Sequence, residues 1–115
     1  MKVQAPFGFV TGCHAEYKFL VGATLTSIRN YCPDVPICLI ADGGVDVSDL
    51  ENQYDLVVLR IDELPSEEMR KMIGGSYRAK LGAMWEGPFE FYVWLDSDAC
   101  IWGDVTADIN TELDF

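Results

Sequence analysis

The segment FEFYVWLDSDACIWGDV, residues 89–105, decides the fold of this 115-residue chain. Its first seven residues are almost all apolar, which is typical of a strand that is buried on both faces of a parallel sheet. The apolar run ends in two aspartates, Asp96 and Asp98, with Ser97 between them. Side chains at i and i+2 of an extended chain point to the same side. We therefore expect both carboxylates to face one ligand while Ser97 faces away.

A divalent cation is the ligand that this pattern favours. Magnesium and manganese prefer oxygen ligands, and magnesium-type sites use one or two carboxylates together with water and substrate phosphate oxygens. Two carboxylates at the end of a buried strand concentrate negative charge, which is costly unless a cation or water relieves it. We predict that Asp96 and Asp98 hold Mn²⁺ or Mg²⁺ against a diphosphate, where the cation neutralises charge on the leaving group. Asp-x-Asp also occurs in solvated loops, and that alternative stays open.

The composition is strongly acidic. Eight lysines and arginines stand against nineteen aspartates and glutamates, which gives a formal net charge of -11. This charge argues against nonspecific binding to nucleic acid or to an anionic membrane surface. It also repels a diphosphate unless a divalent ion and local basic groups intervene, so it favours metal dependence. Half of the residues are hydrophobic, and the length suffices for one compact domain, so we predict a single domain over residues 1–115.

The four cysteines do not form a recognisable metal or disulfide pattern. No C-x-x-C pair is present and His14 is the only histidine, so a zinc site is not expected. We expect mostly buried thiols, with Cys38 and Cys100 in strand-like runs, and leave a disulfide between Cys32 and Cys38 open. No apolar stretch approaches the ~20 residues of a membrane span, which favours a soluble, cytoplasmic domain.

Strand-like and helical patterns alternate along the chain. We predict strands at residues 6–10, 35–40 and 54–61 and a fourth from Phe89, and helices at 19–31, from the capping residue Ser48, at 65–72 as one or two turns, and at 76–85. The strands are continuously apolar instead of alternating in polarity. This predicts an α/β fold with a mainly parallel sheet of about four strands and helices on both faces.

Polar residues follow several of the predicted strands. In open parallel sheets, ligands bind at the carboxyl ends of the strands, near the point where the strand order reverses. Thr11 and Gly12 form the exit of the first predicted strand, Asp42 follows the second, and Asp96 and Asp98 follow the fourth. Asp42 precedes two glycines, so it is either a turn residue or a hydrogen-bonding partner of a base or ribose.

Two basic residues lie in the predicted helix at 76–85. Arg78 and Lys80 are two positions apart, which separates them by about 200° around a helix, so only one is expected to face the cleft. We favour Arg78, because a planar guanidinium can contact a phosphate through two hydrogen bonds. A surface ion pair with an acidic residue is the alternative for Arg78.

Three segments resemble the GT-A nucleotide-sugar glycosyltransferases, in particular the glycogenin-like and lipopolysaccharide-galactosyltransferase-like branch. FVTGCHAEYKFLVGATLTSIRNYCPDVPICLIAD (residues 9–42) is similar to the opening strand, tyrosine and helix of that branch. SYRAKLGAMW (76–85) is similar to its helix whose arginine or lysine lies near the donor, and FYVWLDSDACIWGDV (91–105) to its Asp-x-Asp strand. The resemblance implies a Rossmann-like GT-A fold.

The resemblance also implies roles for single residues. Asp96 and Asp98 would bind Mn²⁺ or Mg²⁺ on the donor diphosphate, with Asp96 also touching the ribose. Thr11 and Tyr17 would line the nucleoside pocket, and Arg78 would approach the sugar or the diphosphate. Packing of the Tyr17 ring under the first helix is the alternative to stacking on the base.

Members of this family continue past the Asp-x-Asp strand into an acceptor-binding half, in which a late histidine commonly binds the metal. This chain stops at Phe115, so we expect the nucleotide-binding fragment of a longer enzyme, or else a small relative that binds without catalysis. The predicted function is a metal-dependent glycosyltransferase domain that uses a nucleotide diphosphate sugar, a UDP-sugar, and an unknown acceptor. Catalytic residues are not assigned.

Two other functions remain as alternatives. A haloacid-dehalogenase-like phosphatase also places Asp-x-Asp after an apolar strand, but there the motif opens the domain and continues with threonine or valine. Here DSDAC lies late in the chain, with Cys100 at that position. The second alternative is a non-catalytic α/β domain that binds a nucleotide sugar or a protein, with Asp96 and Asp98 merely solvated.

Overall fold

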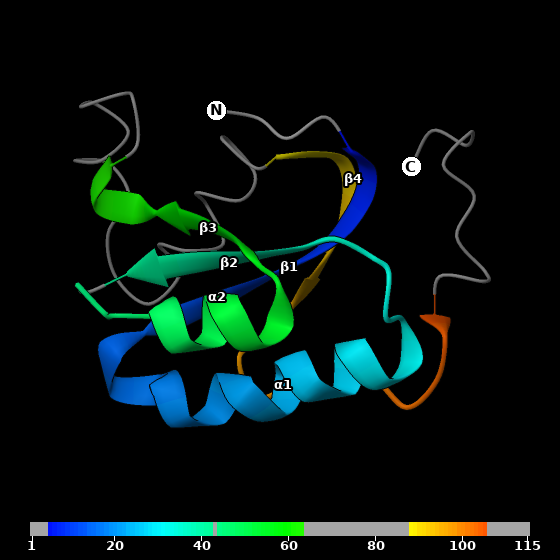
Figure 1. Ribbon diagram of the computed structural model, residues 1–115, viewed down its shortest axis with the longest axis horizontal. Coiled ribbons are helices and arrows are strands. Elements are labelled where there is room, and N and C mark those ends of the chain that lie inside the picture. The colour runs from blue at the N-terminus through cyan, green and yellow to red at the C-terminus, as the bar shows by residue number, and fades with distance from the viewer. Residues whose placement is uncertain (1–4, 43, 64–87, 106–115) are drawn as a thin grey trace.

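The computed structural model describes residues 5–42, 44–63 and 88–105. Four strands and two helices build the described part: β1 (Ala5–His14), α1 (Lys18–Tyr31), β2 (Ile37–Asp42), α2 (Ser48–Tyr54), β3 (Val57–Arg60) and β4 (Phe89–Leu95), with 3₁₀ turns η1 (Ala15–Tyr17) and η2 (Ile61–Glu63). The strands form one parallel sheet in the order β3-β2-β1-β4 (Figure 1). The predicted α/β class and four-stranded parallel sheet are confirmed.

β1 is the strand at which the direction of winding reverses. The unit β1–α1–β2–α2–β3 extends the sheet on one side of β1, whereas β4 pairs with β1 on the other side. In this register Thr11 lies opposite Leu39 of β2 and Leu95 of β4, and His14 lies opposite Asp42. The reversal between β1 and β4 is the place where parallel sheets of this type bind ligands.

Both helices cover the same face of the sheet (Figure 1). The core on this face joins Phe9 and Leu39 of the sheet to Leu25 and Ile28 of α1 and Leu50 of α2. Their burial follows from the apolar stripe of α1, whose members recur every three or four residues.

A second apolar cluster lies on the opposite face of the sheet. Its buried members are Val10, Cys38, Ile40, Ile61 and Phe89. The helices predicted at 65–72 and 76–85 lie outside the described residues, so the prediction that helices cover both faces stays a prediction. Among the residues that the structure describes, no helix is long and apolar enough to cross a membrane.

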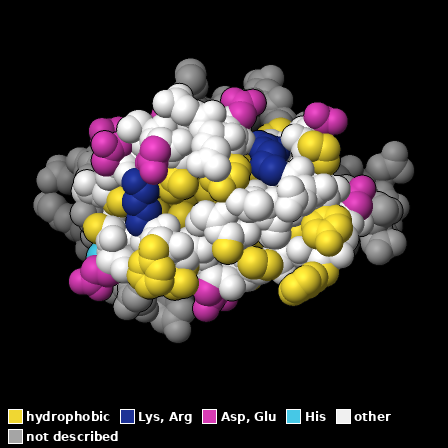
Figure 2. All heavy atoms as spheres, turned by 60° about the horizontal axis from the view of Figure 1, so that its bottom comes forward, with side chains coloured by type: hydrophobic (Ala, Val, Ile, Leu, Met, Phe, Trp, Pro, Cys, Tyr) yellow, Lys and Arg dark blue, Asp and Glu magenta, His cyan; other side chains and the backbone are white. Residues whose placement is uncertain are grey.

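The helix-covered face carries a mixed surface. Acidic and apolar side chains are spread over it in separate places, and few basic ones are visible (Figure 2). The large apolar side chains that are exposed in the described part are Phe19, Tyr31, Trp102 and Val105. Because isolated apolar side chains are normal on a protein surface, this face does not by itself indicate a binding site.

The first strand is longer than its apolar run predicted. β1 continues to His14 because residues 11–13 pair with neighbours in β2, and Thr11 also pairs in β4. The prediction that Thr11 and Gly12 form an exit turn is therefore wrong. β2 starts and ends two residues later than predicted, and Tyr54 is the last residue of α2 instead of the first of β3.

The start of α2 is capped differently from the prediction. Ser48 is the first residue of the helix, and the preceding N-cap position holds Val47, which has no side-chain acceptor. Asp46 takes over this function, because its Oδ1 accepts hydrogen bonds from Ser48 N at 3.0 Å and from Ser48 Oγ at 2.7 Å. The carboxylate thus satisfies a backbone N–H at the start of the helix.

Arg29 joins the ends of both helices to the entry of β2. Its half-buried guanidinium donates to Tyr54 O at 2.8 Å, Val35 O at 2.7 Å, Pro33 O at 3.1 Å and Asp55 O at 3.2 Å. Burial lowers the pKa of this guanidinium below its ordinary value. Asp55 has a left-handed backbone, with φ of 56°, and ends α2. One side chain therefore donates hydrogen bonds to backbone carbonyls from two chain reversals.

The cysteines are buried as predicted, with one exception. Cys13, Cys32 and Cys38 are buried, whereas Cys100 is exposed because β4 ends at Leu95. All four lie within the described residues and no disulfide joins them. Cys32 belongs to the core under the helices and Cys38 to the cluster on the opposite face, which explains why the two thiols do not meet.

Gly8 is required by the packing of the first residue of β4. A Cβ at this position would overlap three carbons of the Phe89 ring. We expect Gly8→Ala to lower the free energy of unfolding by about 1–3 kcal/mol, because the ring must leave its place. The control is Gly22→Ala in α1, where an added Cβ meets nothing within 4 Å and alanine favours the helix by ~0.5–1 kcal/mol. Urea titrations of the two variants check this, and equal stability of Gly8→Ala and wild type would contradict it.

Candidate functional site

The carboxyl ends of β1, β2 and β4 lie at one edge of the sheet. β1 ends at His14 and β2 at Asp42, which are partners in the register, and Asp96 directly follows the end of β4. Because side chains alternate along a strand, His14 shares a face with Val10, and Asp42 with Cys38. Val10 and Cys38 belong to the cluster opposite the helices. His14 and Asp42 therefore stand side by side on the face away from α1.

The two aspartates lie in a turn. β4 ends at Leu95, and Ala99 N donates to Asp96 O at 2.9 Å, which closes a turn over residues 96–99, the Asp-x-Asp turn. The prediction that an extended chain aligns Asp96 and Asp98 is therefore wrong. Both side chains are nevertheless exposed, while Ser97 is half-buried. Trp94 Nε1 donates to Asp96 Oδ1 at 2.9 Å and fixes one carboxylate oxygen.

Hydrogen bonds hold the Asp-x-Asp turn from its buried side. Ser97 Oγ donates to Gly12 O of β1 at 2.6 Å. The hydroxyl of Thr24, which is fully buried in α1, lies 2.9 Å from Ser97 O and 2.5 Å from Ala99 O. Since Ser97 is tied inwards, the side chains on either side of it are left to face solvent.

The segment after the turn is also attached to α1. Ile101 N donates to Ser27 Oγ at 3.1 Å, and Ser27 Oγ donates to Thr24 O at 2.7 Å. Sequence reasoning missed Thr24 and Ser27. A signal was available for Thr24, because it interrupts the apolar stripe of Val21, Leu25 and Ile28.

Thr11 and Gly12 do not line the surface of this edge. Thr11 is fully buried, three residues before the end of β1, on the same face of the sheet as Phe9 and Cys13. Its hydroxyl has no hydrogen-bond partner within the described part of the chain. Gly12 is buried, and its carbonyl receives the bond from Ser97. Because β1 continues past both residues, the expected contact between Thr11 and a nucleoside is not supported.

The structure describes the remaining predicted site residues only in part. Tyr17 is the last residue of η1, directly after the end of β1, and its side chain lies outside the description. Asp42 is half-buried at the end of β2 and is followed at Gly44 by a φ of 69°, as expected of a turn. Arg78 and Lys80 lie outside the described residues.

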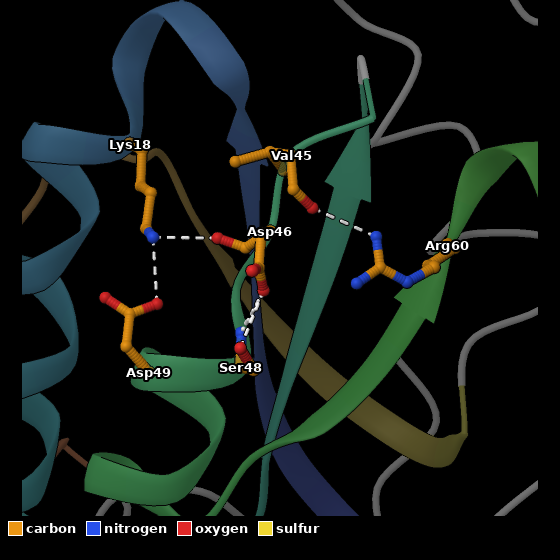
Figure 3. A network of polar contacts seen from close by, with 6 residues as sticks. All are labelled: Lys18, Val45, Asp46, Ser48, Asp49 and Arg60. Atoms are coloured by element: carbon orange, nitrogen blue, oxygen red, sulfur yellow. Dashed lines mark hydrogen bonds and ion pairs between the residues drawn. The ribbon is translucent and has the colours of Figure 1, made fainter.

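Two cations hold the loop between β2 and α2 (Figure 3). Lys18, the first residue of α1, donates from Nζ to Asp46 O at 2.7 Å and to Asp49 Oδ1 at 2.8 Å. Arg60, the last residue of β3, donates from Nη1 to Val45 O at 3.0 Å. Sequence reasoning missed both residues, although each is a basic residue at the end of an element that borders the predicted site.

Hydrogen bonds in this loop shift the pKa values of its charged side chains. The hydrogen bond to Asp49 raises the pKa of Lys18, and the hydrogen bond from Lys18 lowers the pKa of Asp49. The pKa of Asp46 is lowered chiefly by the hydrogen bonds from Ser48. In the described part, the basic side chains Lys18, Arg29 and Arg60 thus all donate to backbone carbonyls.

The oxygen atoms available at this edge of the sheet are ligands that suit a hard cation. Asp96 and Asp98 present exposed carboxylates, which are the ligands that Mg²⁺ and Mn²⁺ prefer. The described residues contain no group of three or more His, Cys, Asp or Glu side chains arranged around one metal position. Two carboxylates are the number of protein ligands that magnesium-type sites commonly use when water and phosphate oxygens complete the coordination.

No protein-family model and no curated protein matches the sequence. Among solved structures, the chain is similar to TarS of S. aureus, a GT-A glycosyltransferase, with a TM-score of 0.61 and 17% identity over 90% of this chain. The structure of S. aureus TarS 1-349 gives a TM-score of 0.62 and 16% identity over 90% of this chain. The likeness shows the fold. This chain spans 18% and 31% of the lengths of those two chains.

The α/β sheet and its two helices therefore match part of a GT-A protein. The predicted GT-A-like architecture is confirmed at this level. The glycogenin-like branch stays a prediction, because the match rests on structure at low identity.

Lys18 gives the loop between β2 and α2 a stability that depends on pH. The pKa of Asp49 lies below its ordinary value of about 4. The ion pair with Lys18 therefore contributes fully to stability above pH ~4, and this contribution is lost as the pH falls through the lowered pKa of Asp49. The raised pKa of Lys18 keeps the pair charged up to pH values above about 10. We expect Lys18→Met to be less stable than wild type at pH 7, and the difference to narrow below pH ~4.

Urea midpoints at pH 7 and pH 3, at low and high salt, measure this difference. High salt should also narrow it, since the partners are solvent-exposed. Asp49→Asn is the matched variant, because it removes the ion pair but leaves the bond from Lys18 to Asp46 O. A difference between Lys18→Met and wild type that stays constant from pH 7 to pH 3 would show that the ion pair does not contribute.

Proposed function

We propose that this chain is the nucleotide-binding part of a metal-dependent glycosyltransferase. Its ligand would be a nucleoside diphosphate sugar, a UDP-sugar, whose sugar is transferred to an acceptor. The observation that carries the proposal is the Asp-x-Asp turn: two exposed carboxylates on an anchored turn, beside the strand reversal of a GT-A-like sheet. A prediction that stays with this proposal is that residues 1–115 form one domain of a longer enzyme.

Asp96 and Asp98 would hold Mn²⁺ or Mg²⁺ together with oxygens of the diphosphate. When bound, such an ion neutralises the negative charge that develops on a departing nucleoside diphosphate. Trp94 supports this function by donating to Asp96 Oδ1, which restricts the rotation of that carboxylate. Ser97 supports it from the opposite side, because its bond to Gly12 O keeps the middle of the turn against β1.

The nucleoside would lie over the ends of β1 and β2. Asp42, half-buried at the end of β2, would accept a hydrogen bond from the base or ribose. Tyr17, in η1 after the end of β1, would stack on the base or pack under α1. Thr11 is not included, since its side chain is fully buried within the sheet.

The diphosphate needs positive charge beyond the metal ion. The described cations Lys18, Arg29 and Arg60 already donate to backbone carbonyls that shape the loops. We therefore retain Arg78, with Lys80 as the alternative, as the basic group that approaches the diphosphate or the sugar. A guanidinium suits this role because it can donate two parallel hydrogen bonds to phosphate oxygens.

The test is the metal dependence of UDP binding. Isothermal titration should show that UDP binds in the presence of Mn²⁺ and that a chelator abolishes binding. Asp98→Ala should weaken Mn²⁺-dependent binding by about tenfold or more, which corresponds to ~1.4 kcal/mol. Affinity for UDP that is unchanged by the chelator would refute the proposal and would leave solvated carboxylates as the explanation.

The matched control is Asp34→Ala. Asp34 is also exposed, but it lies before β2, towards the opposite edge of the sheet. Its removal lowers the net negative charge by the same amount without touching the turn, so UDP binding should stay close to that of wild type. Equal weakening in Asp34→Ala and Asp98→Ala would mean that overall charge, and not the turn, controls binding.

A further inference from the structure

We infer that Thr24, in the middle of α1, is a positioning residue for the Asp-x-Asp turn. Its buried hydroxyl holds the backbone on both sides of Asp98, so that the carboxylates of Asp96 and Asp98 meet the same cation. This inference rests on the proposed function, because it concerns the geometry of that site. It assigns part of the metal site to a helix that contributes no ligand to it.

The contacts of Thr24 bracket Asp98. Oγ1 of Thr24 lies 2.9 Å from Ser97 O, just before Asp98, and 2.5 Å from Ala99 O, just after it. A threonine hydroxyl carries one hydrogen, which is shared between these two carbonyls. The backbone carbonyls around Asp98 are therefore turned inwards towards α1. The side chain of Asp98, in contrast, is exposed.

Two hydroxyl side chains of α1, one helical turn apart, form complementary hydrogen bonds with the chain that follows β4. Thr24 donates to carbonyls of the Asp-x-Asp turn, whereas Ser27, three residues later, accepts from Ile101 N at 3.1 Å. Positions three apart lie on the same side of a helix. The helix thus presents a donor and then an acceptor to the chain that leaves β4.

The burial of Thr24 supports a specific role for its hydroxyl. The Thr24 side chain is fully buried, and the other buried residues of α1 are Val21, Leu25 and Ile28. A hydroxyl is unfavourable in such surroundings unless it forms a hydrogen bond. Serine and threonine in helices often bond to a carbonyl of the preceding turn, which Ser27 does with Thr24 O. Thr24 bonds to the Asp-x-Asp turn instead.

An anchored turn matters because its two carboxylates repel each other. Without a cation, like charges that lie close together favour any movement that separates them. Supporting residues that lock the ligands in place can change metal affinity by about 10–100-fold. Thr24 supplies such support from α1, in addition to the bond between Ser97 and Gly12 of β1.

The experiment compares Thr24→Val, Thr24→Ser and Thr26→Val. Valine keeps the shape of threonine but cannot donate, and serine restores the hydroxyl. Thr26→Val is the matched control, since it makes the same change on α1 and removes a bond to Tyr54 Oη at 2.7 Å, away from the turn. Titration of UDP in the presence of Mn²⁺ gives the affinity, and amide hydrogen exchange of Ala99 and Ile101 reports on the turn and its attachment.

We expect Thr24→Val to weaken Mn²⁺-dependent UDP binding by about tenfold and to speed exchange at Ala99. Thr24→Ser should bind within about threefold of wild type, and Thr26→Val should match wild type in both measurements. A purely structural role would lower the unfolding temperature and leave the affinity of the folded protein unchanged. Titrations well below that temperature separate the two roles.

Other results would contradict either the role of Thr24 or the proposed function. Wild-type affinity in folded Thr24→Val, or an equal loss in Thr26→Val, would overturn the role of Thr24 while the proposed function stands. Failure of the wild-type chain to bind UDP with Mn²⁺ would overturn the proposed function and the metal-positioning role with it. In that case the exchange rate of Ala99 still decides whether Thr24 holds the turn.

Discussion

The position of β4 depends on its pairing with β1. β4 begins at Phe89, far along the chain from the β1–α1–β2–α2–β3 unit, and within the described sheet β1 is its only neighbour. β1 can serve both neighbours because it is buried on both faces, with Phe9 in the core under the helices and Val10 in the cluster on the opposite face. The parallel register of β1 and β4 then carries the end of β4, and the Asp-x-Asp turn that follows it, to the edge where β1 and β2 also end.

α1 organises the loops around this framework through polar side chains at three levels. Lys18 at its start holds the loop between β2 and α2, Thr24 and Ser27 in its middle hold the chain after β4, and Arg29 near its end holds the exit of α2 and the entry of β2. Its apolar stripe meanwhile packs on the sheet. One amphipathic helix therefore holds the segment that follows it in sequence as well as segments much farther along the chain.

Much of the fold followed from hydrophobic periodicity, and the errors have physical causes. Within residues 5–63, the alternation of strands and helices and the helix at 19–31 were correctly predicted, because long apolar patterns reflect burial directly. β1 was predicted too short, since Thr11 and Gly12 are polar or small and its continuation depends on pairing with Leu39 and Leu95. The cap of α2 was misassigned by two residues, because serine and aspartate can both serve there and tertiary contacts choose between them.

The sequence suggested which residues to propose for the site, but it did not indicate the turn that carries two of them. Asp96 and Asp98 were proposed as ligands because they follow an apolar strand, and this role stays a proposal. The turn that carries them is hydrogen-bonded to Thr24, which lies more than seventy residues earlier. Arg29 and Lys18 likewise act on carbonyls far along the chain, and carbonyls carry no sequence signal. Side-chain identity therefore indicates which groups can do chemistry, while the backbone groups that hold them become visible only in the folded chain.

The cysteines add a practical property to the site. Cys13, Cys32 and Cys38 are buried, and burial raises the pKa of Cys38 to about 12, so little of it is present as the reactive thiolate at neutral pH. Cys100 is exposed and lies two residues beyond Asp98. The native chain thus carries its own attachment point for a maleimide-linked fluorophore or nitroxide, directly after the Asp-x-Asp turn in sequence, and spectroscopic labelling there requires no engineered residue.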